Sequence, residues 1–580
     1  MKRIVLILPI AVFFVYFFAL RYDIPWFDEY ENIPYFLQQF LDATTFTERF
    51  NALLKPNNEH RVLYARLVVL GQYWLTGGLS FEGLMLWGNL GLVLIFWLLY
   101  RSTQTEIGAS YEIVGASRGT PPTVILPVTL MLFTAQNYLL TFTAIYTLQY
   151  LAIIMLVMST FYVLALDKPG AFAGALALGA LATFSMGNGL LLWPAGVAML
   201  VIRRRWVWLG VWAVVGAVCI WLYFRNYPVQ QGNAEGFNYV LAHPFQTLAG
   251  FFIFAGSLFD FFPTWSVERR AALPLVMGVI IVGILGYWLV QVVIRFLAKQ
   301  SITTKPAHFQ SFLTGVSLFL LANMALIAVF RIRFYFGMVL HSSYRTYALV
   351  LTAVAYLALM SLLSPGQQKR WVPRLWVLFL FVNVLTYVTY VPEAIQRRKH
   401  MQGLTFNQRH NQIGLGGTQN SPLARWIIEL DSTMRVRNWH TLPSPAITPD
   451  EVQLLQVRGI TRDAPNARTQ FGASRGTPPT LRIADQPDYI NIESDQPDYT
   501  IGLNRGTYVV FWPQNRDTQA YVLFAEQRKP TGINPFSRPN GWLASMPKAL
   551  LPPGRYTLGL FLTTPETSRI VLLDNQVDIR

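Results

Sequence analysis

Three carboxylates lie within four residues in the segment WFDEYE, residues 26–31. The segment follows an apolar run over residues 4–20, at the point where a first membrane helix would leave the bilayer. Carboxylates so close to a membrane cost free energy unless they have a function. A carboxylate can act as a general base, hold a divalent metal ion or orient a hydroxyl group. We therefore take Asp28, Glu29 and Glu31 as candidate functional residues.

The composition indicates a membrane protein. Of the 580 residues, 53% are hydrophobic and only 13% are charged, and the mean hydropathy is +0.36. Soluble domains carry about 25% charged residues. The net charge of +16 does not predict a nucleic-acid partner, because many lysines and arginines stand in short loops between apolar runs. The single cysteine, Cys219, excludes intrachain disulfides and cysteine-based metal sites.

Eleven apolar runs are candidates for membrane spans. With Lys2 and Arg3 inside, eleven spans place the basic loops in the cytoplasm, as the positive-inside rule requires. Two further runs, 62–77 and 246–262, would raise the count to thirteen and put several basic loops outside, so we expect them as helices at the outer surface. Either count predicts a cytoplasmic N-terminus and a C-terminal region outside. The eleven runs are 4–20, 82–100, 121–136, 143–165, 170–186, 189–202, 206–224, 272–297, 309–330, 345–363 and 372–391.

The stretch 170–202 is too long for one span and short for two. The sequence SMGNG at 185–189 predicts a tight outer turn between two short helices. One tilted helix over the whole stretch is the alternative.

The C-terminal third predicts a different structure. Residues 392–440 are polar and are expected to form a linker that contains one amphipathic helix over 421–437. Short strands separated by Gly, Pro and Asn follow, and they predict an all-β, sandwich-like domain over 441–580, outside the membrane. The expected strands are 480–484, 489–493, 507–512, 520–525, 556–562 and 570–573. The expected apolar face of the amphipathic helix is Leu423, Trp426, Ile427 and Leu430.

The membrane domain over residues 1–391 shows a specific resemblance. Its first outer loop, 21–81, carries the acidic pair soon after the first span and then NEHR at 58–61, followed by an amphipathic helix. This arrangement resembles the GT-C superfamily of multispanning glycosyltransferases, and WFDE resembles the branch that contains the protein mannosyltransferases and aminoarabinose transferases. Further similarities are Gln136-Asn137, FSMGNGLLLWP at 184–194 and SSYR at 342–345. The resemblance covers roughly residues 1–395.

The resemblance implies a membrane glycosyltransferase of the bacterial inner membrane. It would transfer a sugar from a polyprenyl-phosphate donor to a glycan, lipid or protein acceptor on the extracytoplasmic face, in contact with membrane lipids. Asp28 would be the general base, and Glu29 would orient the acceptor or hold a metal. The resemblance leaves open whether a divalent metal, Mg²⁺ or Mn²⁺, takes part, and it implies no other cofactor. A plain helix start is the alternative explanation for the acidic pair.

The leaving lipid phosphate needs cationic stabilisation. Arg331, Arg333 and Arg345 are expected on the outer side, against the positive-inside bias, and an anionic headgroup would explain them. Contact with bulk lipid phosphates is the alternative for the first two. The remaining candidates for substrate binding are Glu31, Glu59, His60, Arg61, Gln136 and Asn137; for the last two, a helix cap is the alternative.

Two other functions fit the composition. O-antigen ligases and polymerases also have about a dozen spans, but their large loop lies late in the chain and relies on Arg and His. A non-enzymatic lipid or polysaccharide transporter would tend to show inverted repeats and polar groups at mid-membrane. The early acidic loop therefore favours the glycosyltransferase.

Overall fold

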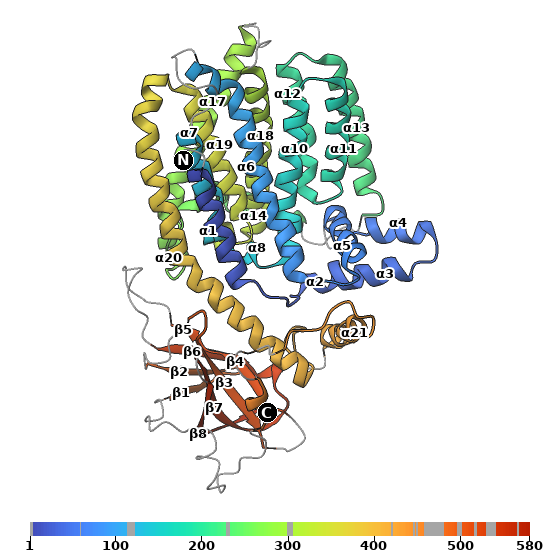
Figure 1. Ribbon diagram of the computed structural model, residues 1–580, viewed down its shortest axis with the longest axis vertical. Coiled ribbons are helices and arrows are strands. Elements are labelled where there is room, and N and C mark those ends of the chain that lie inside the picture. The colour runs from blue at the N-terminus through green and yellow to red at the C-terminus, as the bar shows by residue number, and fades with distance from the viewer. Residues whose placement is uncertain are drawn as a thin grey trace. The chain divides into compact units, whose positions relative to one another are not determined.

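The computed structural model is mostly helical and divides into two compact units (Figure 1). The first unit contains Met1–Ala19, Phe36–Gln72 and Gly83–Tyr390, and the second contains Leu20–Tyr35, Tyr73–Glu82 and Val391–Arg580. The structure describes residues 4–57, 60–112, 122–227, 233–298, 306–418, 421–444, 447, 451–456, 481–495, 502–514, 519–528, 541–564 and 568–579.

Eight helices in the described residues are long and apolar enough to cross a membrane. They confirm a mostly helical protein whose apolar helices suggest membrane insertion, whereas the count of eleven to thirteen spans stays a prediction. The eight are Phe81–Gln104, Thr123–Thr141, Ala144–Ala165, Trp206–Phe224, Val267–Leu297, His308–Arg331, Arg345–Leu362 and Pro365–Asn411. Four shorter apolar helices are Val5–Leu20, Pro169–Thr183, Gly187–Ile202 and Pro244–Ala255.

The helices that lie wholly or partly in the first unit follow one another along the chain. Before the first long span come α1 (Ile4–Leu20), α3 (Phe36–Asp42), α4 (Phe46–Leu54) and α5 (Leu63–Thr76). The central helices are α6 (Phe81–Glu112), α7 (Pro122–Leu132), α8 (Tyr138–Thr141), α9 (Ala144–Tyr146), α10 (Ala152–Ala165), α11 (Pro169–Thr183), α12 (Leu192–Ile202) and α13 (Trp206–Phe224). The last are α14 (Asn233–Ala242), α15 (Pro244–Ala255), α16 (Val267–Arg270), α17 (Ala272–Leu297), α18 (Pro306–Arg331), α19 (Arg345–Leu362) and α20 (Pro365–Asn411).

The prediction of two short helices within 170–202 is confirmed. Helices α11 and α12 are separated by the 3₁₀ turn η4, Gly187–Leu191. At Gly189 a Cβ atom would lie 2.3 Å from the carbonyl oxygen of Ala182, so only glycine allows the chain to turn this tightly. One tilted helix is therefore wrong.

Both runs predicted as surface helices are helical, as α5 and α15. Helix α15 packs against α17, α18 and α19 within the first unit. The approach to α17 is close, because a Cβ at Gly278 would lie 1.8 Å from the carbonyl oxygen of Phe252. Their placement at the membrane surface stays a prediction.

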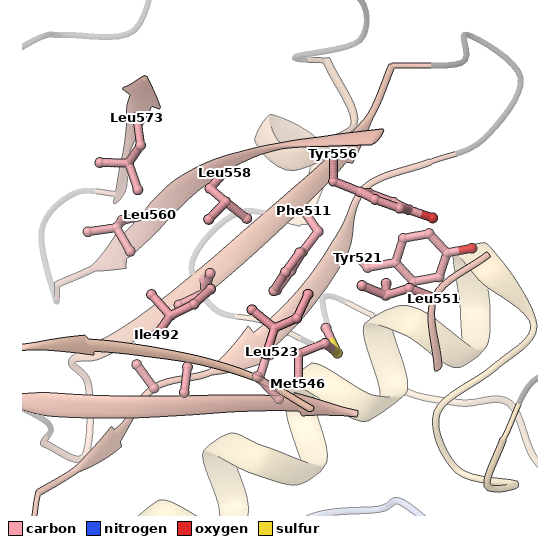
Figure 2. Close-up of a cluster of buried hydrophobic side chains, with 14 of the residues drawn as sticks. Ile492, Phe511, Tyr521, Leu523, Met546, Leu551, Tyr556, Leu558, Leu560 and Leu573 are labelled. Atoms are coloured by element: carbon pink, nitrogen blue, oxygen red, sulfur yellow. The ribbon is translucent and has the colours of Figure 1, made fainter. Parts of the chain in front are cut away.

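The second unit contains two antiparallel four-stranded sheets, which confirms the all-β C-terminal region. Their strand orders are β1-β2-β6-β5 and β4-β3-β7-β8. Buried side chains of both sheets form a shared core, among them Ile492, Phe511 and Leu560 (Figure 2). The strands are β1 (Leu481–Asp485), β2 (Tyr489–Ser494), β3 (Gly506–Pro513), β4 (Tyr521–Phe524), β5 (Glu526–Gln527), β6 (Trp542–Pro547), β7 (Gly554–Thr563) and β8 (Ser568–Ile579).

The expected linker over 392–420 is wrong for most of its length, because α20 continues to Asn411. The polar side chains that suggested a linker serve as partners for the β domain. The Asn407 amide donates to the carbonyl oxygen of Val522 at 2.8 Å and accepts from its N–H at 2.9 Å. Phe406 is fully buried against β3, β4 and β7. Tertiary contacts thus stabilise a helix whose sequence looks like a loop.

The amphipathic helix is confirmed as α21 (Pro422–Val436), with one change to its apolar face. Ile427 and Leu430 are buried, as expected, together with Ala424 and Met434. Leu423 is exposed instead. Its N-cap is Ser421, whose hydroxyl accepts from the N–H of Ala424.

Candidate functional site

A cavity of about 360 Å³ lies in the first unit and brings three of the predicted site residues together. These are His60, Arg331 and Arg333. The other lining residues are mostly aromatic, aliphatic or amide side chains, and none of the described ones is a carboxylate. They are Tyr150, Met186, Gly187, Asn188, Leu190, Tyr223, Phe224, Tyr227, Phe237, Asn323, Leu326, Ile327, Phe330, Tyr344 and Tyr347.

The secondary structure explains how these side chains meet. Helix α18 supplies Asn323 and ends at Arg331, and eight residues of helix separate the two by about 12 Å along the axis. The turn η4 supplies Asn188, and the start of α19 supplies Tyr347. A cationic end of the cavity is therefore separated from an uncharged amide end.

At the cationic end, Arg333 pairs with an exposed carboxylate. The Arg333 guanidinium pairs with Glu235 at 3.0 Å, and 73% of the Glu235 side chain is exposed. It also lies over the ring of Phe334, at 4.5 Å. An ion pair with so exposed a partner is weak, and an incoming anion can replace the carboxylate.

Arg61 has a different environment. Its guanidinium donates to the carbonyl oxygens of Tyr223, Leu54 and Arg225, at 3.1, 2.5 and 2.9 Å. The bonds to Tyr223 and Arg225 join the first loop to the end of α13, next to the cavity. Arg61 therefore shapes the cavity wall rather than lining the cavity.

Arg345 does not line this cavity either. It lies in a buried cluster with Asp260, Arg270 and Tyr390. The Arg345 guanidinium pairs with Asp260 and donates to the carbonyl oxygen of Leu340, and only 1% of its side chain is exposed. The expectation that it grips a phosphate beside Arg331 or Arg333 does not match this position.

The cluster carries an excess of positive charge. Arg270 pairs with the same Asp260 carboxylate at 2.6 Å, so two guanidinium groups share one carboxylate. The Nη1 atom of Arg345 is buried without a hydrogen-bond partner among the described residues. Burial, together with Arg345 and Arg270, lowers the pKa of the neighbouring His341 to about 4, so this imidazole is neutral.

Gln136 and Asn137 support the same cluster. The Gln136 amide donates to the carbonyl oxygens of Ser257 and Asp260, at 2.9 and 3.1 Å. The Asn137 amide donates to the Thr346 hydroxyl at 2.9 Å. Both side chains thus hold the loop that carries Asp260 against α19.

The acidic segment belongs to the second unit. It forms the short helix α2 (Asp28–Tyr30) and a π-helical turn, η1 (Glu31–Tyr35). The preceding residue, Phe27, has φ of +40°, a strained conformation for a bulky side chain. The Glu29 carboxylate is buried and accepts from the N–H of Trp26 at 2.6 Å, so it caps its own turn.

Asp28 is the carboxylate of this segment that the resemblance implies as the general base. It is half-buried, and its side chain has no hydrogen-bond or ion-pair partner among the described residues. Burial, and secondly the charge of Glu31, raise its pKa above the usual value for aspartate. A half-buried carboxylate of raised pKa suits a general base.

Side chains of α20 and α21 hold α2 and the residues next to it in place. Tyr30 is fully buried and donates to the Asp431 carboxylate of α21 at 3.0 Å. The Gln408 amide donates to the other oxygen of Asp431, also at 3.0 Å. Arg397 lies over the ring of Trp26, at 4.4 Å.

Asp431 gives the second unit a pH-dependent stability. Burial raises the pKa of Asp431 from 3.8 to about 7, although the hydrogen bonds from Tyr30 and Gln408 lower it. Stability from such a group is complete below pH 4 and is lost as pH rises through 7. The uncharged variant Asp431→Asn does not lose this stability. The difference in apparent Tm between the variant and the wild type should therefore shift in favour of the variant from pH 5 to pH 8. Equal differences at both pH values would contradict the assignment.

The described residues contain no group of three or more His, Cys, Asp or Glu side chains that could hold a metal ion. Glu59 lies outside the described residues. The involvement of Mg²⁺ or Mn²⁺ therefore stays open.

Comparison with known proteins identifies no relative: no protein-family model, curated protein or solved structure matches this chain. Its function must therefore be inferred from the residues and their geometry.

Proposed function

We propose that this chain is an integral membrane glycosyltransferase of GT-C architecture, with about eleven spans. It transfers a sugar from a polyprenyl-phosphate donor to a glycan, lipid or protein acceptor on the extracytoplasmic face. In this proposal the N-terminus is cytoplasmic, the β domain is extracytoplasmic, and the membrane is the bacterial inner membrane.

One observation carries the proposal: the cavity combines two arginines and a histidine with aromatic, amide and aliphatic side chains inside an apolar helical unit. Arginine suits a phosphate because its guanidinium donates in a fork that matches phosphate oxygens. Aromatic rings and amides suit a sugar, and aliphatic walls suit a prenyl chain. A lipid-phosphate-linked sugar contains all three parts.

The chemistry requires a base and a stabilised leaving group. Asp28 takes the proton of the acceptor hydroxyl while the oxygen of this hydroxyl forms the bond to the anomeric carbon. The bond between that carbon and the phosphate oxygen breaks, and the electron pair leaves with the polyprenyl phosphate. Arg331 and Arg333 stabilise the negative charge of this phosphate.

The double variant Arg331→Gln/Arg333→Gln tests the phosphate site. It should raise the Kd for decaprenyl phosphate about 10–100-fold, because a hydrogen bond to a charged group contributes about 1.5–3 kcal/mol. Binding is measured with the purified full chain in detergent. The exposed Arg269, in the same unit and outside the cavity, gives the matched control Arg269→Gln.

The outcome separates the alternatives. Equal loss of affinity in the control would mean a non-specific attraction to anionic lipid. Unchanged affinity in the double variant would contradict the phosphate site. Tight binding without transfer of any sugar would favour a lipid carrier.

A further inference from the structure

The side-chain amides of Asn188 and Asn323 contact each other in the cavity wall, and each keeps one group without a hydrogen-bond partner among the described residues. The Asn188 amide N–H donates to the Asn323 oxygen at 2.7 Å and to the Tyr347 hydroxyl at 2.8 Å. The Asn188 oxygen and the Asn323 nitrogen are both buried, and neither has a hydrogen-bond partner among the described residues. Only 1% of Asn323 is exposed. One acceptor and one donor therefore stay without a partner among the described residues.

This result does not depend on how the two amides are oriented. If both are turned by 180°, the Asn323 nitrogen donates to the Asn188 oxygen. The atoms left over are then the Asn188 nitrogen and the Asn323 oxygen. In either orientation the pair keeps one free donor and one free acceptor.

Leaving such groups unsatisfied in a buried place costs about 1–3 kcal/mol each. Both asparagines line the cavity, and a ligand there can satisfy these two groups once the side chains turn toward it. No carboxylate among the described lining residues balances a positive charge at this end of the cavity. The best-matched group is uncharged and presents a donor and an acceptor together.

The position of the pair matches one part of the proposed donor. Asn323 lies about 12 Å along α18 from Arg331, which is proposed to hold the phosphate. Arg333, near that end, faces an exposed partner, whereas Asn323 is buried. The amide pair therefore lies where the sugar ring would be placed.

We propose that Asn188 and Asn323 select the sugar of the donor. They bind an uncharged ring substituent, a hydroxyl or an acetamido group, that both donates and accepts a hydrogen bond. Tyr347 fixes Asn188 for this role. The site discriminates against amino sugars, whose ammonium group cannot accept a hydrogen bond and finds no counter-charge. This inference rests on the proposed function, because it assigns the sugar end of the same cavity.

The test compares the binding of three probes to the purified full chain: bare decaprenyl phosphate, the same lipid bearing a neutral hexose or N-acetylhexosamine, and the same lipid bearing an aminopentose. The wild type should bind at least one neutral-sugar lipid about tenfold more tightly than the bare lipid. The aminopentose lipid should show a clearly smaller gain, because its ammonium group cannot accept a hydrogen bond. An equal or larger gain for the aminopentose would overturn the inference without any variant.

Variants then assign the gain to the two amides. Asn188→Leu and Asn323→Leu should each bring the affinity ratio of neutral-sugar lipid to bare lipid close to one, with the Kd of the bare lipid unchanged. Asn323→Ser, a smaller change, serves if a leucine variant does not fold. The matched control is Asn89→Leu, a buried asparagine of the same unit outside the cavity, which should keep the ratio.

Different results would contradict the proposed function and the assignment of the sugar site. A wild type that does not bind bare decaprenyl phosphate contradicts the proposed function. A wild type that binds it, with a sugar-dependent gain that survives in all asparagine variants, contradicts only the assignment of the sugar site.

Discussion

The Asp28→Asn variant should lose sugar transfer by about 10²–10⁴-fold, the contribution expected of a positioned general base. The asparagine side chain fills the same space but cannot take the acceptor proton. The fold should be unaffected, because the Asp28 carboxylate has no partner among the described residues. The measurement is the initial rate of transfer by purified protein, with binding of decaprenyl phosphate as a test of integrity. Full activity in Asp28→Asn would remove the proposed base.

The neighbouring Glu31 supplies the matched control and a pH signature. Activity requires the deprotonated Asp28, so the rate should rise with pH through the pKa of this residue. Since Glu31 raises that pKa, Glu31→Gln should move the acidic limb of the profile to lower pH and keep the plateau. A limb that does not move would mean that another group controls it.

The Asp260→Asn variant should lose about 3–5 kcal/mol of stability, the typical result of breaking a buried ion pair by removing one partner. Asp260 is fully buried and is shared by Arg270 and Arg345. Without its charge, two guanidinium groups remain close together with no carboxylate. We expect a large fall in apparent Tm and in the yield of folded protein.

Arg270→Gln is the informative comparison for this cluster. It leaves Asp260 and Arg345 as a neutral pair, and Arg270 is itself partly exposed. This variant should therefore be clearly more stable than Asp260→Asn. If Asp260→Asn were as stable as the wild type, the cluster would not hold the fold together, and Arg345 would be available for another role.

The sequence predicts the helical elements well where hydrophobicity decides them. Long apolar runs and the SMGNG turn gave the correct helices, because burial and glycine sterics are local properties. The β domain was also recognised from its short alternating strands. The strand β6 was missed, since its sequence WLASMP contains no β-branched residue.

Polar residues were harder to interpret, because their role depends on partners far away in the chain. Asn407 and its neighbours suggested a linker, but they are partners for strand β4. Arg345 looked like an outer phosphate ligand, yet Asp260 neutralises it across 85 residues. A single aspartate in the apolar run 246–262 was the available signal for that pairing.

Three of the site residues chosen from the sequence lie together in the structure. His60, Arg331 and Arg333 line one cavity. The sequence analysis did not select Asn188, Asn323 and Tyr347. Asn323 and Tyr347 follow Asn188 by 135 and 159 positions, and no spacing rule connects residues so far apart. The available signal for Asn323 was its position as a polar residue within the apolar run 309–330.

Native mass spectrometry of the intact protein, purified from its own membrane, tests the central claim most directly. We predict a co-purifying lipid with the mass of a polyprenyl phosphate, with or without a sugar, that is lost in Arg331→Gln/Arg333→Gln and retained in Arg269→Gln. Ordinary phospholipids alone, bound equally to all three proteins, would contradict a site for a lipid-phosphate-linked sugar.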